Sequence, residues 1–311
     1  MDTGTIDPAV LSALTAAGLN PATVANIVGR ALAEDLADGP DITTTATIAP
    51  DQLGTALMVP REAGIVAGLP VAAFAFAIAG EGRVKVELNG QDGDLVRAGE
   101  TLLTATGPVR DLLTAERTAL NLVTHLSGVA TLTQLWVAAV AGTDARIRDT
   151  RKTMPGLRAL EKYAVRCGGG VNHRMSLSDA ALIKDNHVEA AGSVTRAFQL
   201  VKELAPDLPV EVEVDTVEQC VEAIEAGAEL ILLDNMSVAD LKACVALAAE
   251  ARAQGNAVKL EASGGLSLGV AADVAATGVD YLSVGALTHS APVLDLGLDL
   301  TPNLQEEKGE S

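Results

Sequence analysis

Apolar positions near the N-terminus first follow a helical spacing and then change to short runs. Between residues 8 and 36 they recur at helical intervals, with a break at Asn20-Pro21, which predicts two helices. From 54 to 107 the apolar runs are short and separated by glycine, which predicts a small sheet. The run LPVAAFAFAIAG is long enough for a helix across that sheet, and one long helix is expected at about 109–141.

Beyond residue 145, short apolar strands alternate with amphipathic helical segments. The expected strands are ARIRDT, ALIKDN, PVEVEVDT, LILLDN, AVKLEASGG and YLSVG, a rhythm typical of a parallel α/β sheet. Polar residues stand at or near their carboxyl ends: Asp149, Lys184, Asp185, Glu213, Asp215, Asp234, Glu261 and Ser283. A barrel brings such ends to one rim, whereas a doubly wound sheet does not bring six strands round one centre, so we expect a barrel.

Composition narrows the classes of partner. The chain has 311 residues, a formal charge of −19 and only one Trp, two Tyr and three Phe, so nucleic-acid binding is not expected. The three cysteines follow no metal-ligand spacing and the N-terminus has no secretory-signal pattern, which favours reduced thiols in a cytoplasmic protein. The uncharged stretch between Arg117 and Asp144 could span a membrane by length. Its polar residues and missing basic collar favour a helix in a core or subunit interface instead.

Positive charge is concentrated in residues 146–187, which hold nine of the 22 Lys and Arg residues and four acids. Three of the nine recur every fourth residue, and we interpret them as a solvated helix face: Arg158, Lys162 and Arg166. Four others stand at strand ends or in loops: Arg151, Lys152, Arg174 and Lys184. Like charges gathered at one rim repel each other unless an anion joins them, and arginine pairs well with carboxylates and phosphates. This segment therefore predicts a ligand with several negative charges.

Two glycine-containing turns follow consecutive strands in the last part of the chain. They are Ser263-Gly264-Gly265 and Val284-Gly285-Ala286. Glycine lets bare backbone N–H groups approach an oxyanion, and barrels often hold phosphate between their last two strand ends, so these turns predict a phosphate cradle. Glu213 and Asp234 stand at successive strand ends, where carboxylates could hold a divalent ion or sugar hydroxyls, or could offset the nearby cations.

A long segment of the chain resembles a known family. DTRKTMPGLRALEKYAVRCGGGVNHRMSLSDAALIKDNH, followed in order by EVEVDT, LLDN, EASGG and SVGALTHS, is similar to quinolinate phosphoribosyltransferase, the decarboxylating nicotinate-nucleotide pyrophosphorylase. The pieces EDLADGPDITT, REAGIVAG and AERTALN also resemble it, so the likeness covers nearly the whole chain up to Pro302. One departure, GPDITT in place of a tighter Gly-Asp-Ile-Thr-Thr, touches no catalytic position.

The resemblance implies an α/β fold with two domains. Residues 1–125 would form an N-terminal α+β sandwich-like domain with a connecting helix, and 126–301 an incomplete or irregular (β/α) barrel that carries catalysis. Residues 302–311 are acidic and are expected to be a disordered tail. The resemblance further implies a homodimer or higher oligomer in which Arg117 completes the neighbouring site. From the composition and the uncharged stretch described above, neither nucleic acid nor membrane is expected as a partner.

The resemblance also implies substrates, a cofactor and residue roles. Quinolinate and Mg²⁺-bound phosphoribosyl pyrophosphate would give nicotinate mononucleotide, pyrophosphate and CO₂. Arg151, Arg174 and Lys184 would hold the quinolinate carboxylates, with Thr150 and His173 nearby. Lys152 would meet the pyrophosphate, and Glu213 and Asp234 would hold the ribose hydroxyls and the metal. The turns at 263–265 and 284–286 would take the 5′-phosphate.

Among these residues, Lys184, Glu213 and Asp234 are the candidate catalytic groups. Lys184 or His173 is the candidate group beside the carbon that loses CO₂. Three alternatives remain open at this point. Lys184 could be a Schiff-base lysine of an aldolase. The chain could be a transferase that acts on nicotinate without decarboxylation, or a barrel that binds anions without catalysis.

Overall fold

The computed structural model describes residues 6–37 and 39–302, and the predicted tail lies, from residue 303, outside them. The chain forms two compact units. Of the described residues, the first unit comprises 6–37, 39–132, 155–168 and 291–302, and the second comprises 133–154 and 169–290. Residues 155–168 and 291–301 were expected in the barrel domain but belong to the first unit.

The first unit contains an antiparallel sheet of four strands in the order β12-β1-β5-β3. These strands are β1 (Leu53–Pro60), β3 (Lys85–Leu88), β5 (Leu103–Pro108) and β12 (Leu296–Pro302). Met58 pairs with Leu103 on one side and with Leu298 on the other, so β12, from the last part of the described chain, joins strands from the first 110 residues in one sheet. A separate two-stranded ladder joins β2 (Gly64–Ile65) and β4 (Leu95–Val96).

Helices complete the first unit. They are α1 (Pro8–Ala16), α2 (Pro21–Asp35), α3 (Ile42–Thr47), α4 (Leu69–Ala79), most of α5 (Val109–Ala139) and α6 (Arg158–Cys167). The helix α4 has no polar side chain and contacts β3, β5, α1 and α2, which places it in the core as its composition predicts. The expected pair of N-terminal helices, the helix across the sheet and the long helix are confirmed.

The helix α5 is long and apolar enough to cross a membrane by length and composition, but half of its most apolar window is buried in the structure. One expectation for the neighbouring helix α6 is wrong. Lys162 was expected on a solvated face, yet it is fully buried, while Arg166 is exposed and Arg158 is half-buried. Spacing by four aligns charges on a helix but does not reveal what else packs against that side.

The second unit contains the six expected strands in one parallel sheet with the order β6-β11-β10-β9-β8-β7. They are β6 (Arg146–Arg148), β7 (Ala181–Ile183), β8 (Val210–Val214), β9 (Leu230–Asp234), β10 (Lys259–Ser263) and β11 (Tyr281–Ser283). The order runs in sequence from β7 to β11 and then places the first strand beside the last, which is barrel winding without the reversal of a doubly wound sheet. Within the described residues β6 and β7 do not pair, so the barrel is incomplete.

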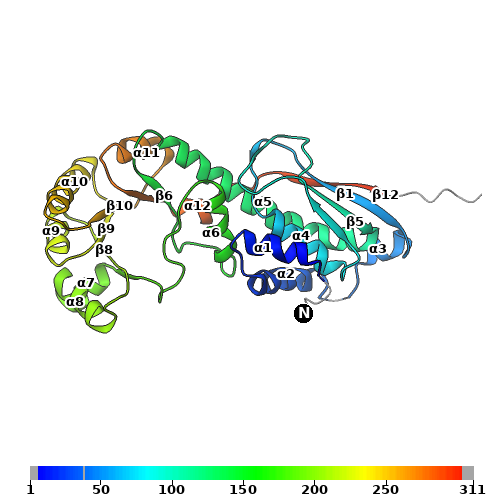
Figure 1. Cartoon of the computed structure of the whole chain (residues 1–311), viewed down its shortest axis with the longest axis horizontal. Coiled ribbons are helices and arrows are strands. Elements are labelled where there is room, and N and C mark those ends of the chain that lie inside the picture. The colour runs from blue at the N-terminus through cyan, green and yellow to red at the C-terminus, as the bar shows by residue number, and fades with distance from the viewer. Residues whose placement is uncertain (1–5, 38, 303–311) are drawn as a thin grey trace, which may run out of the picture. The chain divides into compact units, whose positions relative to one another are not determined.

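Helices follow the strands of this sheet, and α8 to α11 pack against them on the outer side (Figure 1). They are α7 (Asp185–Ala191), α8 (Val194–Leu204), α9 (Val217–Glu225), α10 (Val238–Ala253), α11 (Leu268–Ala275) and α12 (Ala286–His289). Ser193, Thr216 and Ser237 cap α8, α9 and α10 by accepting hydrogen bonds from backbone N–H groups. The caps of α9 and α10 fix the short turns that join β8 and β9 to these helices, so the residues at the carboxyl ends of these two strands are held on a rigid frame.

Candidate active site

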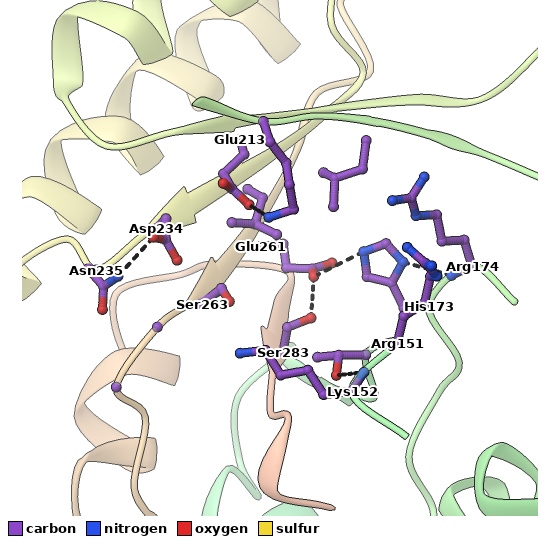
Figure 2. A pocket seen from close by; sticks show the side chains of 16 residues that line it. Arg151, Lys152, His173, Arg174, Glu213, Asp234, Asn235, Glu261, Ser263 and Ser283 are labelled. Atoms are coloured by element: carbon purple, nitrogen blue, oxygen red, sulfur yellow. Dashed lines mark hydrogen bonds and ion pairs between the residues drawn. The ribbon is translucent and has the colours of Figure 1, made fainter. Parts of the chain in front are cut away.

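A cavity of about 580 Å³ lies at the carboxyl ends of the parallel strands (Figure 2). Its lining contains most of the predicted site residues: Thr150, Arg151, Lys152, His173, Arg174, Lys184, Glu213, Asp234, Ser263, Gly264 and Gly265. Leu182, Leu232, Asn235, Glu261 and Ser283 complete the lining. Residues from all six strand ends or from the loops that follow them therefore meet around one space.

Cations from three separate segments line this cavity, as the charge pattern predicted. Arg151 and Lys152 follow β6, Arg174 lies in the loop before β7, and Lys184 follows β7. Burial, followed by the charge of Arg151, lowers the pKa of Arg174. The Nε atom of Arg151 is buried and has no hydrogen-bond partner among the described residues. A buried donor without an acceptor is costly, so this arginine is suited to receive an anionic ligand.

Glu213 and Asp234 contribute carboxylates to the same cavity. Glu213 forms an ion pair with the ammonium of Lys184, and Asp234 accepts a hydrogen bond from Asn235 Nδ2 at 2.8 Å. Glu213 and Asp234 also line a smaller cavity of about 260 Å³, together with Asp185, Glu189 and Asp215. Oxygen donors of this kind fit Mg²⁺, which usually binds one or two carboxylates and completes its shell with water and substrate phosphates.

The first glycine turn contributes bare backbone to the cavity. Gly264 has a φ of +89°, and a Cβ atom there would lie 2.3 Å from Asn235 Oδ1. Asn235 itself has a φ of +53°, and its N–H donates to Ser263 O at 2.9 Å. The turns after β9 and β10 therefore fit against each other, and only glycine at 264 leaves room for this arrangement.

The second glycine turn, residues 284–286, is not part of the lining. It packs beside Lys152 instead: a Cβ atom at Gly285 would lie 2.9 Å from Lys152 Cδ, and Thr288 Oγ1 donates to Lys152 O at 2.7 Å. Val284 is buried, and Ala286 begins the short helix α12. The turn therefore supports a lining residue, and its own contact with a phosphate stays a prediction. Arg117 lies on α5 in the first unit, so its part in a neighbouring site also stays a prediction.

Glu211 was missed by sequence reasoning, whereas His173 and Glu261, which it lies beside, were both named from the sequence. His173 Nε2 lies 2.8 Å from Glu211 Oε2 and 3.7 Å from Glu261 Oε1, and Glu261 also bonds to Arg148 and Ser283. Burial raises the pKa of Glu211 to about 7. The pKa of Glu261 is also raised, first by burial and then by the negative charge of Glu211. The alternation VEVEV in β8 was the available signal, since it places Glu211 on the same face as Glu213.

The three groups His173, Glu211 and Glu261 lie close enough to hold a metal ion by distance alone. The hydrogen bonding opposes that use. The backbone N–H of Arg174 donates to His173 Nδ1 at 2.7 Å, whereas a histidine that binds metal through Nε2 carries its proton on Nδ1. Arg148 also pairs with Glu261 and supplies the positive charge that a cation would bring.

Comparison with known proteins agrees with this geometry. The family models for the N-terminal and C-terminal domains of quinolinate phosphoribosyl transferase match residues 41–127 and 129–299. The nicotinate-nucleotide pyrophosphorylase [carboxylating] of Mycobacterium leprae is 55% identical over 274 residues, which cover 88% of this chain and 95% of that protein. A protein of Nicotiana tabacum named quinolinate phosphoribosyltransferase [decarboxylating] 1b is 38% identical and covers 91% of this chain and 84% of its own length.

A solved structure is similar over the same extent. The nicotinate-nucleotide pyrophosphorylase from Francisella tularensis superposes with a TM-score of 0.85 at 38% identity, covering 91% of this chain and 98% of that chain. The same assignment follows from three findings. They are the family models that match both parts of the sequence, the relative that is 55% identical and the fold that agrees over 91% of this chain. This chain belongs to the quinolinate phosphoribosyl transferase family.

Proposed function

We propose that this chain transfers the 5-phosphoribosyl group of phosphoribosyl pyrophosphate to quinolinate and releases CO₂ and pyrophosphate. The product is nicotinate mononucleotide, a precursor of NAD. The relatives' names carry both "carboxylating" and "decarboxylating", which are the two directions of this one reaction. The observation that carries the proposal is the cavity in which cations from three segments converge, since quinolinate and phosphoribosyl pyrophosphate are both polyanions.

Arg151 and Arg174 are suited to the two adjacent carboxylates of quinolinate, because guanidinium groups offer paired donors in one plane. The unpartnered Nε of Arg151 would gain its missing acceptor there. Lys184, fixed by its ion pair with Glu213, adds a third positive charge on the other side of the cavity. A substrate with one carboxylate would leave part of this charge uncompensated, so the lining favours a dicarboxylate.

In the transfer step the pyridine nitrogen forms a bond to ribose C1 while the bond from C1 to pyrophosphate breaks. Lys152, which lines the cavity, would offset the charge that builds on the leaving oxygen, the kind of electrostatic stabilisation that usually contributes most. Glu213 and Asp234 would bind the ribose hydroxyls and hold Mg²⁺, which when bound would neutralise further charge on the pyrophosphate. The N–H groups at residues 263–265 would bind the 5′-phosphate.

In the second step the bond between C2 of the pyridinium ring and its carboxyl group breaks. The electron pair stays on C2 beside the positively charged nitrogen, and CO₂ leaves. A proton then adds to C2 and gives nicotinate mononucleotide. Arg151, Arg174 and Lys184 would keep the ring fixed during both steps, so the chain needs to supply little acid–base chemistry before the last proton transfer.

We also propose a homodimer in the cytoplasm, with Arg117 of one subunit closing the site of the other. The spacing of the three cysteines favours reduced thiols, and the structure, which describes all three, joins none of them in a disulfide. The aldolase alternative has lost its support, because Lys184 is engaged with Glu213 as a charged group and the chain belongs to a transferase family.

The direct test uses quinolinate labelled with ¹³C in the 2-carboxyl group. We expect labelled CO₂, pyrophosphate and nicotinate mononucleotide to appear in equal amounts when phosphoribosyl pyrophosphate and Mg²⁺ are present. Release of pyrophosphate without labelled CO₂ would show a transferase that does not decarboxylate. Absence of all three products from the folded protein would refute the proposal.

A further inference from the structure

The side chain of His173 is held from beneath the cavity by hydrogen bonds to both ring nitrogens. The residue is 8% exposed, lines the cavity and comes from the loop that precedes β7 (Figure 2). Its Nδ1 receives the backbone N–H of Arg174 at 2.7 Å. Its Nε2 lies 2.8 Å from Glu211 Oε2, with Glu261 Oε1 farther away at 3.7 Å.

These contacts fix the position of the ring proton. A neutral imidazole has one N–H, and a nitrogen that accepts an N–H cannot carry a hydrogen of its own. The proton of His173 therefore sits on Nε2 and is donated to Glu211, which is not part of the cavity lining. The other ring nitrogen already accepts a bond from the chain, so no ring N–H remains to pass a proton to a substrate.

Burial of the Glu211 carboxyl group lowers the stability of the fold. Glu211 is 3% exposed, and its Oε1 has no hydrogen-bond partner among the described residues. A buried carboxyl group with an unsatisfied oxygen opposes folding, so a role in the site is the natural explanation for its presence. The hydrogen bond to His173 is the contact through which Glu211 reaches the cavity.

The same loop segment is also anchored through its backbone. Asp149, which is fully buried, accepts bonds from His173 N at 2.7 Å and from Asn172 Nδ2 at 2.6 Å. Arg174 Nη1 donates to Ala180 O at 2.8 Å. Asp149 thus fixes the main chain of this loop, whereas Glu211 fixes the imidazole that receives the N–H of Arg174. Rotation of the ring would break both hydrogen bonds of the imidazole at once.

We propose that Glu211 is a positioning residue of the quinolinate site: it holds His173 as the Nε2–H tautomer and, through Nδ1, keeps Arg174 oriented toward the substrate carboxylate. His173 then acts by shape and orientation, and the proton that reaches C2 does not come from its ring. The kinetic part of this inference rests on the proposed function, whereas the tautomer can be measured without any substrate.

The first experiment is ¹⁵N NMR of the full chain with labelled histidine at neutral pH and without ligand. The signals of His173, one of four histidines, are identified by their loss in His173→Gln. We expect a protonated Nε2 and an unprotonated Nδ1. Glu211→Gln should keep this tautomer because an amide oxygen still accepts, whereas Glu211→Leu should lose it. A wild-type His173 with its proton on Nδ1, or on both nitrogens, would overturn the proposal whatever the protein catalyses.

The second experiment separates positioning from general damage by comparing two Michaelis constants. Glu211→Leu should raise the KM for quinolinate by about tenfold or more, as loss of an orienting partner usually does, and should change the KM for phosphoribosyl pyrophosphate far less. Glu211→Gln should show a smaller rise. The control is Glu229→Leu, which removes an exposed carboxylate that lines, together with Glu211, a second cavity of about 550 Å³. This variant should leave both constants unchanged.

Two kinetic results would contradict the proposal. One is a Glu211→Leu enzyme that folds and has an unchanged KM for quinolinate. The other is a rise of both Michaelis constants that is as large in Glu211→Gln as in Glu211→Leu. That result would indicate that the charge of Glu211 matters and not its hydrogen bond to His173. If Glu211→Leu does not fold, Glu211→Gln and the wild-type tautomer still decide the question.

Discussion

Arg151 shows how a single side chain can indicate the ligand of its site. Its guanidinium lines the cavity, yet Nε is buried without a partner in the described structure. The pKa of Arg174 is lowered by burial and, to a smaller extent, by the positive charge of Arg151. Both features are unfavourable without a ligand and would be relieved by an anion. We therefore expect these arginines to contribute mainly to binding of the dicarboxylate.

Substitution of either arginine should test this expectation. Arg151→Ala and Arg174→Ala should each cost about 1.5–3 kcal/mol, the usual loss for a hydrogen bond to a charged group. That corresponds to a fall of roughly 10- to 100-fold in kcat/KM for quinolinate. Arg146→Ala removes an exposed arginine from the start of β6 and is the matched control. Normal turnover by both site variants would remove the basis of the assignment.

Glu211 should also make the stability of the fold depend on pH. Burial raises its pKa from 4.5 to about 7, so over this interval the folded chain keeps a proton that the unfolded chain has lost. The stability from this group is full below pH 4.5 and is lost as the pH rises through about 7, at about 1.4 kcal/mol per pH unit at most. The free energy of unfolding, measured with denaturant, should therefore fall more steeply between pH 4.5 and about 7 in the wild type than in Glu211→Gln. Parallel curves for the two proteins would contradict this pKa.

Single residues also mark the limit of reasoning from sequence alone. The concentration of cations in 146–187 correctly indicated that Arg151, Lys152, Arg174 and Lys184 share one cavity. The same pattern gave the wrong environment for Lys162, because periodicity shows which side of a helix carries charge and not what covers it. The carboxyl groups of Glu211 and Glu261 were not foreseen as a buried pair, since strand alternation does not distinguish a solvated face from a barrel interior.

At the scale of elements, the turn between β10 and α11 depends on a glycine that no other residue can replace. Gly264→Ala places a Cβ atom 2.3 Å from Asn235 Oδ1 at a φ of +89°. We expect a loss of about 1–3 kcal/mol in the free energy of unfolding. We also expect a rise of roughly tenfold or more in the KM for phosphoribosyl pyrophosphate, because the N–H groups of the cradle would shift.

Gly269→Ala is the control for this substitution. Gly269 lies in α11, and its added Cβ would meet only Ser267 Oγ, at 3.9 Å. Alanine is favoured over glycine inside a helix by roughly 0.5–1 kcal/mol, so this variant should be slightly more stable and should keep its KM. If the two variants behave alike in thermal melting and in kinetics, the close fit at 264 has no consequence.

The sequence predicted elements well where the signal was local. The strands that alternate with helices beyond residue 145 and the apolar helix α4 follow from periodicity and composition. It did not predict β12, because that strand is defined by its pairing with the distant strand β1, as between Met58 and Leu298. It also did not predict that residues 155–168 belong with the first unit. Non-local pairing of this kind leaves no pattern in a short window of sequence.

At the scale of the whole molecule, a shared site makes a sharp prediction about mixed dimers. Arg117→Ala and Lys184→Ala should each be nearly inactive alone. If Arg117 of one subunit completes the site of the other, a mixed dimer of the two variants has one intact site. Random reassembly of equal amounts should then restore about a quarter of wild-type activity, since half of the dimers are mixed. A mixture that stays as inactive as its components would contradict the shared site.

The central claim is that the converging cations select a dicarboxylate for phosphoribosyl transfer. The most direct measurement compares kcat/KM for quinolinate and for nicotinate with the same protein at saturating phosphoribosyl pyrophosphate. We predict a preference for quinolinate of at least about 100-fold, since nicotinate leaves a cationic contact without its anion. Equal rates for the two bases, or a preference for nicotinate, would contradict the account.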